Sequence, residues 1–212
     1  MNLLCRTIRS TRQLIKPASL KRICVFAGSN SGARVEYVAA ARELGRELAQ
    51  RRLGLVYGGA RVGLMGALAD EALSGGGRVI GVMPEALVAK EIAHRGLSEL
   101  RVVKSMHERK ATMADLADGF VALPGGWGTM EEFFEVLTWG QLGLHRKPCG
   151  LLNIQGYFDR LLSFAEHCVD EGFVKREHRS MISVSSSANE LLDGLAAYEA
   201  PVVKKWIDRA ET

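Results

Sequence analysis

The chain has 212 residues, of which 47% are apolar and 25% are charged, and no shift in composition divides it into two domains. Residues 1–22 carry six basic and no acidic side chains, so the formal net charge of +4 leaves −2 (+4 minus +6) for the remainder. The charge is therefore no evidence for nucleic-acid binding by the folded domain, and no apolar run reaches the roughly 18 residues that span a bilayer.

We expect residues 1–20 to be a basic, disordered extension ahead of a single domain over residues 21–212. The extension is rich in Arg, contains Ser and Thr and lacks acids, features also typical of an organellar transit peptide. A disordered extension on a cytoplasmic protein is the simpler interpretation, and we favour it. The scattered cysteines predict reduced thiols, two of them on core strands: Cys5, Cys24, Cys149 and Cys168, with Cys24 and Cys149 on the strands.

Strand and helix patterns alternate along the rest of the chain. Short apolar runs predict strands at residues 22–27, 53–57, 78–83, 100–103, 120–123, 148–153 and 182–184. Apolar residues at helical spacing predict helices at residues 33–52, 130–143, 157–171 and 187–209, and further helices through Leu64, Leu68 and Leu73 and through Met106, Met113 and Leu116. Residues 85–98 predict a loop with a short helical piece, and Trp206 and Ile207 are expected to dock the end of the chain.

This alternation predicts a single α/β domain, a Rossmann-like, doubly wound parallel sheet with helices on both faces. In such sheets ligands bind beyond the carboxyl ends of the strands, at a switch in strand order. Three glycine clusters follow predicted strands and are therefore candidates for one site.

The first cluster contains Gly28 and Ser29, directly after the first strand. It lacks the G-x-G-x-x-G spacing, and no acid follows the second strand to hold a ribose hydroxyl. The cluster is either a nucleotide-facing turn or a tight connection between strand and helix, and its sequence does not decide between them.

The second cluster places glycines at Gly58, Gly59, Gly63 and Gly66. The last two fall at the start of a predicted helix, where a glycine costs roughly 1 kcal/mol relative to alanine. A close approach, of a ligand or of a packing helix, is needed to explain them. No Gly-Lys-Ser/Thr follows any cluster, so a P-loop is absent.

The third cluster is the most informative, because a buried strand runs into three glycines and then into a helix. Its members are Gly125, Gly126, Trp127, Gly128, Thr129 and Met130, followed by Glu131 and Glu132. Free backbone N–H groups and the helix dipole favour an anion such as a phosphate at this junction. The two acids could simply stabilise the dipole, but their place one turn from the glycines also suits chemistry on a phosphorylated molecule.

Arg109 and Lys110 lie early in the preceding predicted helix, where the dipole disfavours cations. They either form a solvated face or reach an anion bound at the third cluster, and we favour the second alternative. The five histidines show no metal-ligand spacing and no G-x-S-x-G motif occurs, so the sequence predicts neither a metal site nor a serine hydrolase.

The run Pro124-Gly-Gly-Trp-Gly-Thr-Met-Glu-Glu132 matches the P-G-G-x-G-T-x-x-E signature of the Lonely Guy (LOG) family, and Met106-His-Glu-Arg-Lys110 matches its companion motif. The chain resembles this family, the cytokinin riboside 5′-monophosphate phosphoribohydrolases, over about residues 21–195. The resemblance implies dimers or larger homo-oligomers, with residues 138–143 as a candidate interface. It also implies hydrolysis of the N-glycosidic bond of N6-modified AMP, or of AMP itself, without a cofactor or metal.

By the same resemblance, Arg109 and Glu132 are the catalytic pair and the third cluster binds the 5′-phosphate. Further ligand contacts would come from Lys110, Glu131 and Glu91. Trp127 stands at the variable position of the signature, so the resemblance leaves the preferred base open. Family members have also been described as lysine decarboxylases, but no pattern for a lysine that binds pyridoxal phosphate is evident.

Two other classes remain open at the level of sequence. A nucleotide or molybdenum-cofactor carrier of similar fold would keep the glycine loops but would not need Glu132. An NAD- or ATP-dependent enzyme is disfavoured, because the dinucleotide and Walker signatures are missing.

Overall fold

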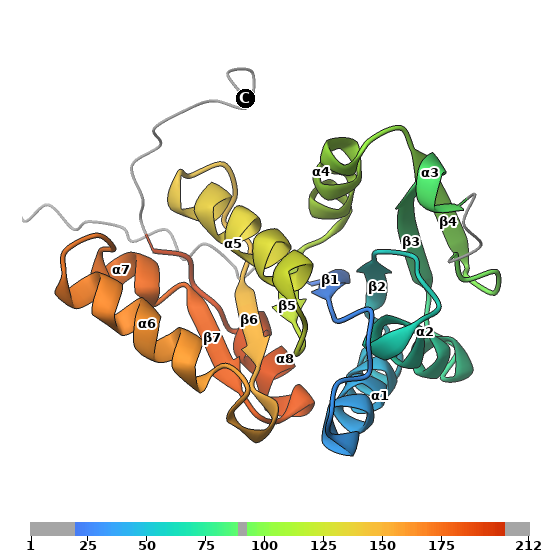
Figure 1. Ribbon diagram of the computed structural model, residues 1–212, viewed down its shortest axis with the longest axis horizontal. Coiled ribbons are helices and arrows are strands. Elements are labelled where there is room, and N and C mark those ends of the chain that lie inside the picture. The colour runs from blue at the N-terminus through green and yellow to red at the C-terminus, as the bar shows by residue number, and fades with distance from the viewer. Residues whose placement is uncertain (1–19, 89–92, 202–212) are drawn as a thin grey trace, which may run out of the picture.

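The computed structural model describes residues 20–88 and 93–201. Seven strands form one parallel sheet in the order β4-β3-β2-β1-β5-β6-β7 (Figure 1). The strands are β1 (Arg22–Phe26), β2 (Gly54–Tyr57), β3 (Val79–Pro84), β4 (Glu99–Val103), β5 (Gly119–Ala122), β6 (Cys149–Leu152) and β7 (Ile182–Ser185). The predicted Rossmann-like, doubly wound sheet is confirmed.

The helices form a layer on each face of the sheet. They are α1 (Val35–Gln50), α2 (Gly63–Ser74), α3 (Glu85–Val88), α4 (Met106–Leu116), α5 (Trp127–Gln141), α6 (Asp159–Asp170), α7 (Arg176–Arg179) and α8 (Ala188–Ala196), with a short 3₁₀ helix η1 (Ile154–Gly156). Within the described ranges, no helix is both long and apolar enough to cross a membrane.

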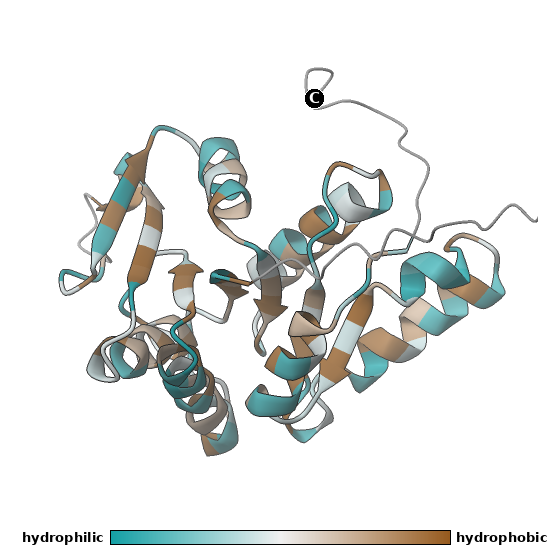
Figure 2. Ribbon diagram, turned by 180° about the vertical axis from the view of Figure 1, so that it is seen from behind, coloured by the Kyte–Doolittle hydropathy of each residue, from teal (hydrophilic) through white to brown (hydrophobic). Residues whose placement is uncertain are grey.

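Two apolar clusters hold the layers together, because successive strand residues point to opposite faces of a sheet. On β1, Ile23 and Val25 pack under α1, α2 and α8, whereas Cys24 and Phe26 pack under α4, α5 and α6. The strands are accordingly brown along most of their length in Figure 2, and the outer helix faces carry much of the teal. Cys24 and Cys149 are both buried on strands, as predicted.

Several predicted boundaries are wrong. The helix predicted to begin at residue 130 begins at Trp127, because Gly126 takes an extended conformation and acts as the N-cap. The last predicted helix ends at Ala196, and α7 was not predicted. The docking of Trp206 and Ile207, the extension over residues 1–19 and the position of Glu91 lie outside the described residues.

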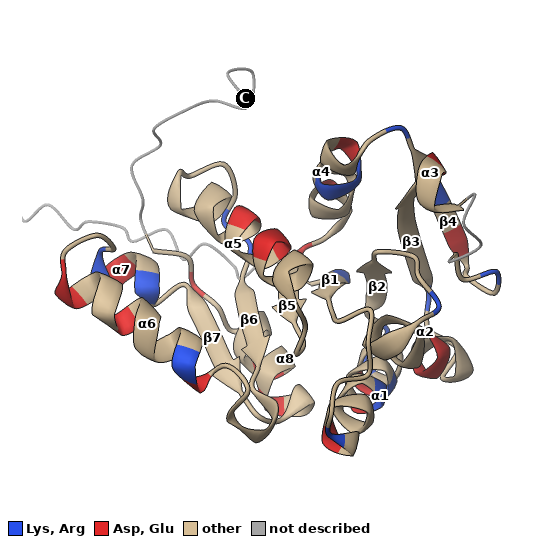
Figure 3. Cartoon of the chain, viewed as in Figure 1, with Lys and Arg blue, Asp and Glu red and all other residues tan. Residues whose placement is uncertain are grey.

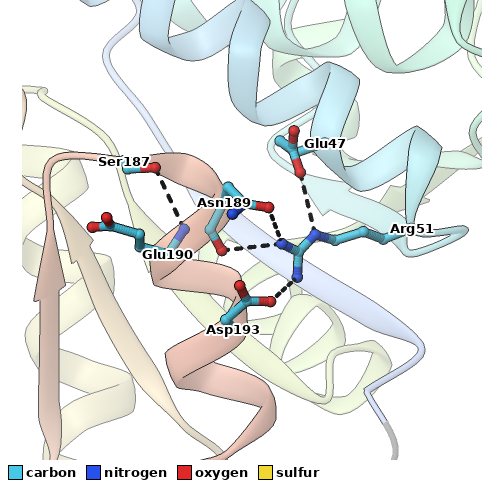
Figure 4. A network of polar contacts seen from close by, with 6 residues as sticks. All are labelled: Glu47, Arg51, Ser187, Asn189, Glu190 and Asp193. Atoms are coloured by element: carbon cyan, nitrogen blue, oxygen red, sulfur yellow. Dashed lines mark hydrogen bonds and ion pairs between the residues drawn. The ribbon is translucent and has the colours of Figure 1, made fainter.

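Figure 4 shows a polar network that ties α8 to the end of α1. Arg51 donates to Asp193 at 2.7 Å, to the backbone carbonyl of Asn189 at 3.1 Å and to Glu47 at 3.2 Å. Burial alone would lower the pKa of Arg51, but its bonds to Asp193 and Glu47 raise the pKa above its ordinary value. The guanidinium therefore stays charged and joins the end of α1 to α8.

Arg52, the next residue, has a left-handed backbone with φ of +56°. Its N–H donates to Ala49 O at 3.0 Å, and that of Leu53 donates to Leu48 O at 2.8 Å, the hydrogen-bond pattern that usually ends on glycine. We expect Arg52→Gly to raise the free energy of unfolding by about 0.5–1 kcal/mol, measured by urea denaturation. Arg52→Ala keeps the Cβ atom and should give no such gain; an equal gain would assign the effect to the lost side chain.

Candidate active site

The site lies where the strand order reverses. Strands β1 to β4 follow one another toward one edge of the sheet, and β5 then pairs with β1 on its other side. The loops after β1 and β5 consequently touch: the N–H of Gly28 donates to Pro124 O at 3.1 Å. A Cβ atom on Gly28 would lie 3.3 Å from the Cα of Gly125, so a small residue keeps the two loops together.

Gly63 belongs to the packing of this junction. Its backbone has φ of +59°, and a Cβ atom there would overlap the carbonyl carbon of Ser29. The next residue, Leu64, donates its N–H to Gly28 O at 3.0 Å. A Cβ atom on Gly66 would likewise overlap the carbonyl of Arg61. The close approach that the sequence requires at these two glycines is therefore met by backbone packing.

The third glycine cluster forms the open N-terminus of α5. Among the described residues no side chain caps this helix, and its N-cap Gly126 has open space where a Cβ atom would stand. Thr129 is only 4% exposed, and a Cβ atom on Gly125 would overlap its hydroxyl. The first-turn N–H groups have no partner within the helix, which makes this turn a suitable cradle for an anion.

Arg109 and Glu132 meet beside this cradle. Nη1 of Arg109 lies 2.9 Å from Oε1 of Glu132, and each side chain is 12% exposed. The contact is an ion pair between the guanidinium and the carboxylate. The Nε–H of Arg109 donates to Val82 O at 3.1 Å. This bond fixes the guanidinium at the carboxyl end of β3.

Gly58 makes room for that guanidinium. A Cβ atom at position 58 would overlap Nη2 of Arg109. Gly59, by contrast, has φ of +79° and packs against Gly81, and its carbonyl accepts the N–H of His94 at 2.9 Å. Of these two predicted site residues, Gly58 therefore lies against Arg109 of the ion pair, whereas Gly59 packs against β3.

Lys110 bridges two acids on α5. Its Nζ lies 2.9 Å from Glu135 and forms a second, shorter contact with Glu131. Burial alone would lower the pKa of Lys110, but the bonds to Glu131 and Glu135 raise it, so the ammonium stays charged. Figure 3 shows Lys and Arg in blue on α4 and Asp and Glu in red on α5. Glu135 was missed by the sequence analysis, although its i, i+4 spacing from Glu131 places both on one face of the helix.

Burial raises the pKa of Glu132 above its ordinary value. The positive charge of Arg109 opposes this shift without cancelling it, and the negative charge of Glu131 adds to it. The two neighbouring acids therefore differ: Glu131 is 57% exposed at its side chain, whereas Glu132 is buried beside a cation. A carboxylate in such a setting suits a charge-stabilising or proton-accepting role.

The other predicted site residues differ in their exposure. The Trp127 side chain is 92% exposed on the first turn of α5, and Met130 is half-buried against the core that includes Phe133. Ser29 is exposed in the loop after β1. In the described part of the chain no group of three or more His, Cys, Asp or Glu side chains could hold a metal ion.

Comparison with known proteins places the chain in a family. The sequence is 51% identical over 179 residues to the cytokinin riboside 5′-monophosphate phosphoribohydrolase LOG7 of Arabidopsis thaliana, covering 84% of this chain and 82% of that protein. The chain belongs to the LOG family. The LOG enzyme of Oryza sativa subsp. japonica is 48% identical over 191 residues, covering 89% of this chain and 79% of that one. Residues 65–195 also match a family model described as possible lysine decarboxylase.

Solved structures share the fold at low identity. The molybdenum cofactor binding protein of Rippkaea orientalis is 22% identical, with a TM-score of 0.64 over 85% of this chain and 98% of that one. The molybdenum cofactor carrier protein of Chlamydomonas reinhardtii is 21% identical, with a TM-score of 0.62 over 84% and 99%. At this identity the likeness shows only that this chain shares the fold of these two proteins.

Proposed function

We propose that this LOG-family protein hydrolyses the N-glycosidic bond of adenosine 5′-monophosphates, with or without an N6 substituent. AMP and water would give adenine and ribose 5-phosphate. The observation that carries the proposal is the buried Arg109–Glu132 pair at 2.9 Å, next to the open N-terminus of α5. The names of relatives about 50% identical, which are cytokinin riboside 5′-monophosphate phosphoribohydrolases, support it.

Cleavage of the bond leaves positive charge on the ribose, in an oxocarbenium-like transition state. The carboxylate of Glu132 stabilises that charge, and it accepts a proton from the water that attacks C1′. Its raised pKa makes it a better proton acceptor than an exposed glutamate. Arg109 stays charged and donates hydrogen bonds, so it orients the nucleotide and offsets negative charge on the departing base.

The phosphate cradle supplies binding energy at a distance from the reacting bond. The N–H groups of Gly126, Trp127 and Gly128 hold the 5′-phosphate, and the first glycine turn at Gly28 closes its other side. Binding at that end positions C1′ against Glu132. Lys110, held at the same edge by Glu131 and Glu135, would add a ligand contact.

We also propose that the protein is a homo-oligomer and that it is cytoplasmic. A homodimer or larger homo-oligomer would bring two copies together near residues 138–143, and exposed Phe134 on the same helix adds an apolar contact to that face. Cys24, Cys149 and Cys168 are free thiols, which suits a cytoplasmic protein. Glu91 would complete the ligand contacts from the segment after α3.

A product assay tests the proposed reaction. The protein is incubated with AMP or isopentenyladenosine 5′-monophosphate, and the mixture is separated by chromatography. We expect free base and ribose 5-phosphate in equal amounts, and adenosine, which lacks the phosphate, to be a far poorer substrate. A protein that binds both nucleotides but releases no base would instead be a carrier.

The activity should fall on the acid side as Glu132 becomes protonated. Because the pKa of Glu132 is raised, the acid limb of kcat/KM should lie above the ordinary glutamate value of about 4.3. The Glu131→Gln variant removes a negative charge that raises this pKa, so its limb should move to lower pH. Measuring kcat/KM for AMP between weakly acidic and neutral pH locates the acid limb of the wild type and of Glu131→Gln. If the limb of Glu131→Gln stays at the same pH or moves to higher pH, the acid limb does not belong to Glu132.

A further inference from the structure

We infer that Tyr157 is a positioning residue for the phosphate cradle, an inference that rests on the proposed function. Its hydroxyl donates a hydrogen bond to Gly125 O at 2.5 Å. Tyr157 comes from the loop after β6, and β5 and β6 are parallel neighbours, so their following loops meet at one edge of the sheet. The contact thus joins the cradle to a segment 32 residues away in sequence.

The hydrogen bond acts on the donor side of the cradle through a single peptide plane. No cis peptide bond occurs in the described chain, so the carbonyl of Gly125 and the N–H of Gly126 point in opposite directions across one rigid unit. Holding the carbonyl from one side therefore holds the N–H toward the other. Gly126 has open space where a Cβ atom would stand, so side-chain packing does not restrain this peptide at that point.

Glycine on both sides of that peptide gives such a restraint an effect. Two adjacent glycines allow the plane to rotate more freely than any other pair of residues, and an N–H that rotates is a poorer anion donor. A hydrogen bond to the carbonyl also polarises the peptide, which strengthens the N–H on its far side. Tyr157 therefore adds a restraint on the peptide plane to the packing of Gly125 against Thr129 and Gly28.

The loop that carries Tyr157 is itself tightly built. Gln155 and Gly156 have φ of +53° and +69°. The side chain of Asn153 accepts the N–H of Phe158 at 2.7 Å and donates to Asp159 at 2.7 Å. Phe158 is 1% exposed, so it anchors the loop in the core.

The aromatic ring of Tyr157 is held from two sides, although 41% of the residue remains exposed. It meets the rings of Phe158 and Tyr37 edge-on, with centroids 5.0 Å and 5.6 Å apart. These ring contacts set the direction of the hydroxyl, and they would persist without it. Deleting only the oxygen atom therefore separates the restraint on Gly125 from the packing.

The test compares Tyr157→Phe with Tyr37→Phe, which makes the same chemical change on the neighbouring ring. The Tyr37 hydroxyl makes no hydrogen bond within the described residues. Calorimetry measures the binding of ribose 5-phosphate, which reports on the cradle, and of adenine, which lacks a phosphate. We expect Tyr157→Phe to bind ribose 5-phosphate about 3- to 10-fold more weakly, the loss typical of one neutral hydrogen bond. Its adenine affinity, and both affinities of Tyr37→Phe, should equal those of the wild type.

Four results would overturn the inference: unchanged binding of ribose 5-phosphate by Tyr157→Phe, an equal loss of adenine binding, the same loss in Tyr37→Phe, or no binding of ribose 5-phosphate by the wild type. Turnover of AMP by the wild type is measured separately. If the wild type binds ribose 5-phosphate and Tyr157→Phe binds it more weakly, the positioning role stands even when no base is released. In that case only the proposed reaction fails.

Discussion

Replacing Glu132 by glutamine is expected to lower kcat for AMP by roughly 10²- to 10⁴-fold, with a much smaller change in KM. Glutamine has the same shape and can face Arg109 through its carbonyl oxygen. It carries no negative charge to stabilise the ribose cation, and it accepts no proton from water. Since the proposed phosphate site lies elsewhere, at the N-terminus of α5, ground-state affinity should survive. Steady-state rates of base release measure the effect.

Glu131→Gln is the matched control, because it makes the same change one residue away. Glu131 is 57% exposed and contacts Lys110, which Glu135 also holds at 2.9 Å. We expect its kcat near neutral pH to stay within about tenfold of the wild type, as for the loss of a partly exposed ion pair. Equal losses in both variants would show that the general charge of α5 matters and that Glu132 has no special role.

The sequence predicted the architecture because its signals are local. Apolar runs, helical spacing and glycine clusters each lie within a few residues, and they were sufficient to predict a parallel sheet with candidate ligand loops at its carboxyl edge. The position of Arg109 was also informative, since a cation early in a helix has an unfavourable dipole interaction. The structure places Arg109 against Glu132, while the catalytic roles of both stay predictions.

What the sequence could not predict depends on contacts between distant segments. Tyr157 has no motif of its own, and only the pairing of β5 with β6 brings it to Gly125. Gly63 could have faced a ligand or a neighbouring segment, and only its fit against Ser29 decides for packing. The start of α5 was misplaced because glycine has a low helix propensity, whereas here Gly126 serves as the N-cap and Gly128 lies inside the first turn.

Gly58→Ala replaces neither member of the ion pair, yet it is expected to lower kcat/KM for AMP by roughly 10- to 100-fold. The new methyl group would overlap Nη2 of Arg109. A long side chain yields more easily than backbone, so the guanidinium should move away from its 2.9 Å contact with Glu132 while the fold is kept. The control is Gly194→Ala, a glycine of α8 whose Cβ position has open space. It should retain full activity.

A double-mutant cycle decides whether Gly58 acts through Arg109. In an Arg109→Ala background the guanidinium is gone, so the methyl group of Gly58→Ala has nothing to displace. The double variant should then have the same kcat/KM as Arg109→Ala alone. The coupling free energy of the cycle would equal the whole effect of Gly58→Ala in the wild type. Additive losses would mean that Gly58→Ala damages the site by another route, such as a shift of the β2 loop. The guanidinium of Arg109 also donates through Nε to the carbonyl of Val82 on β3, at 3.1 Å. In that case this bond to β3, and not Gly58, would position Arg109 against Glu132.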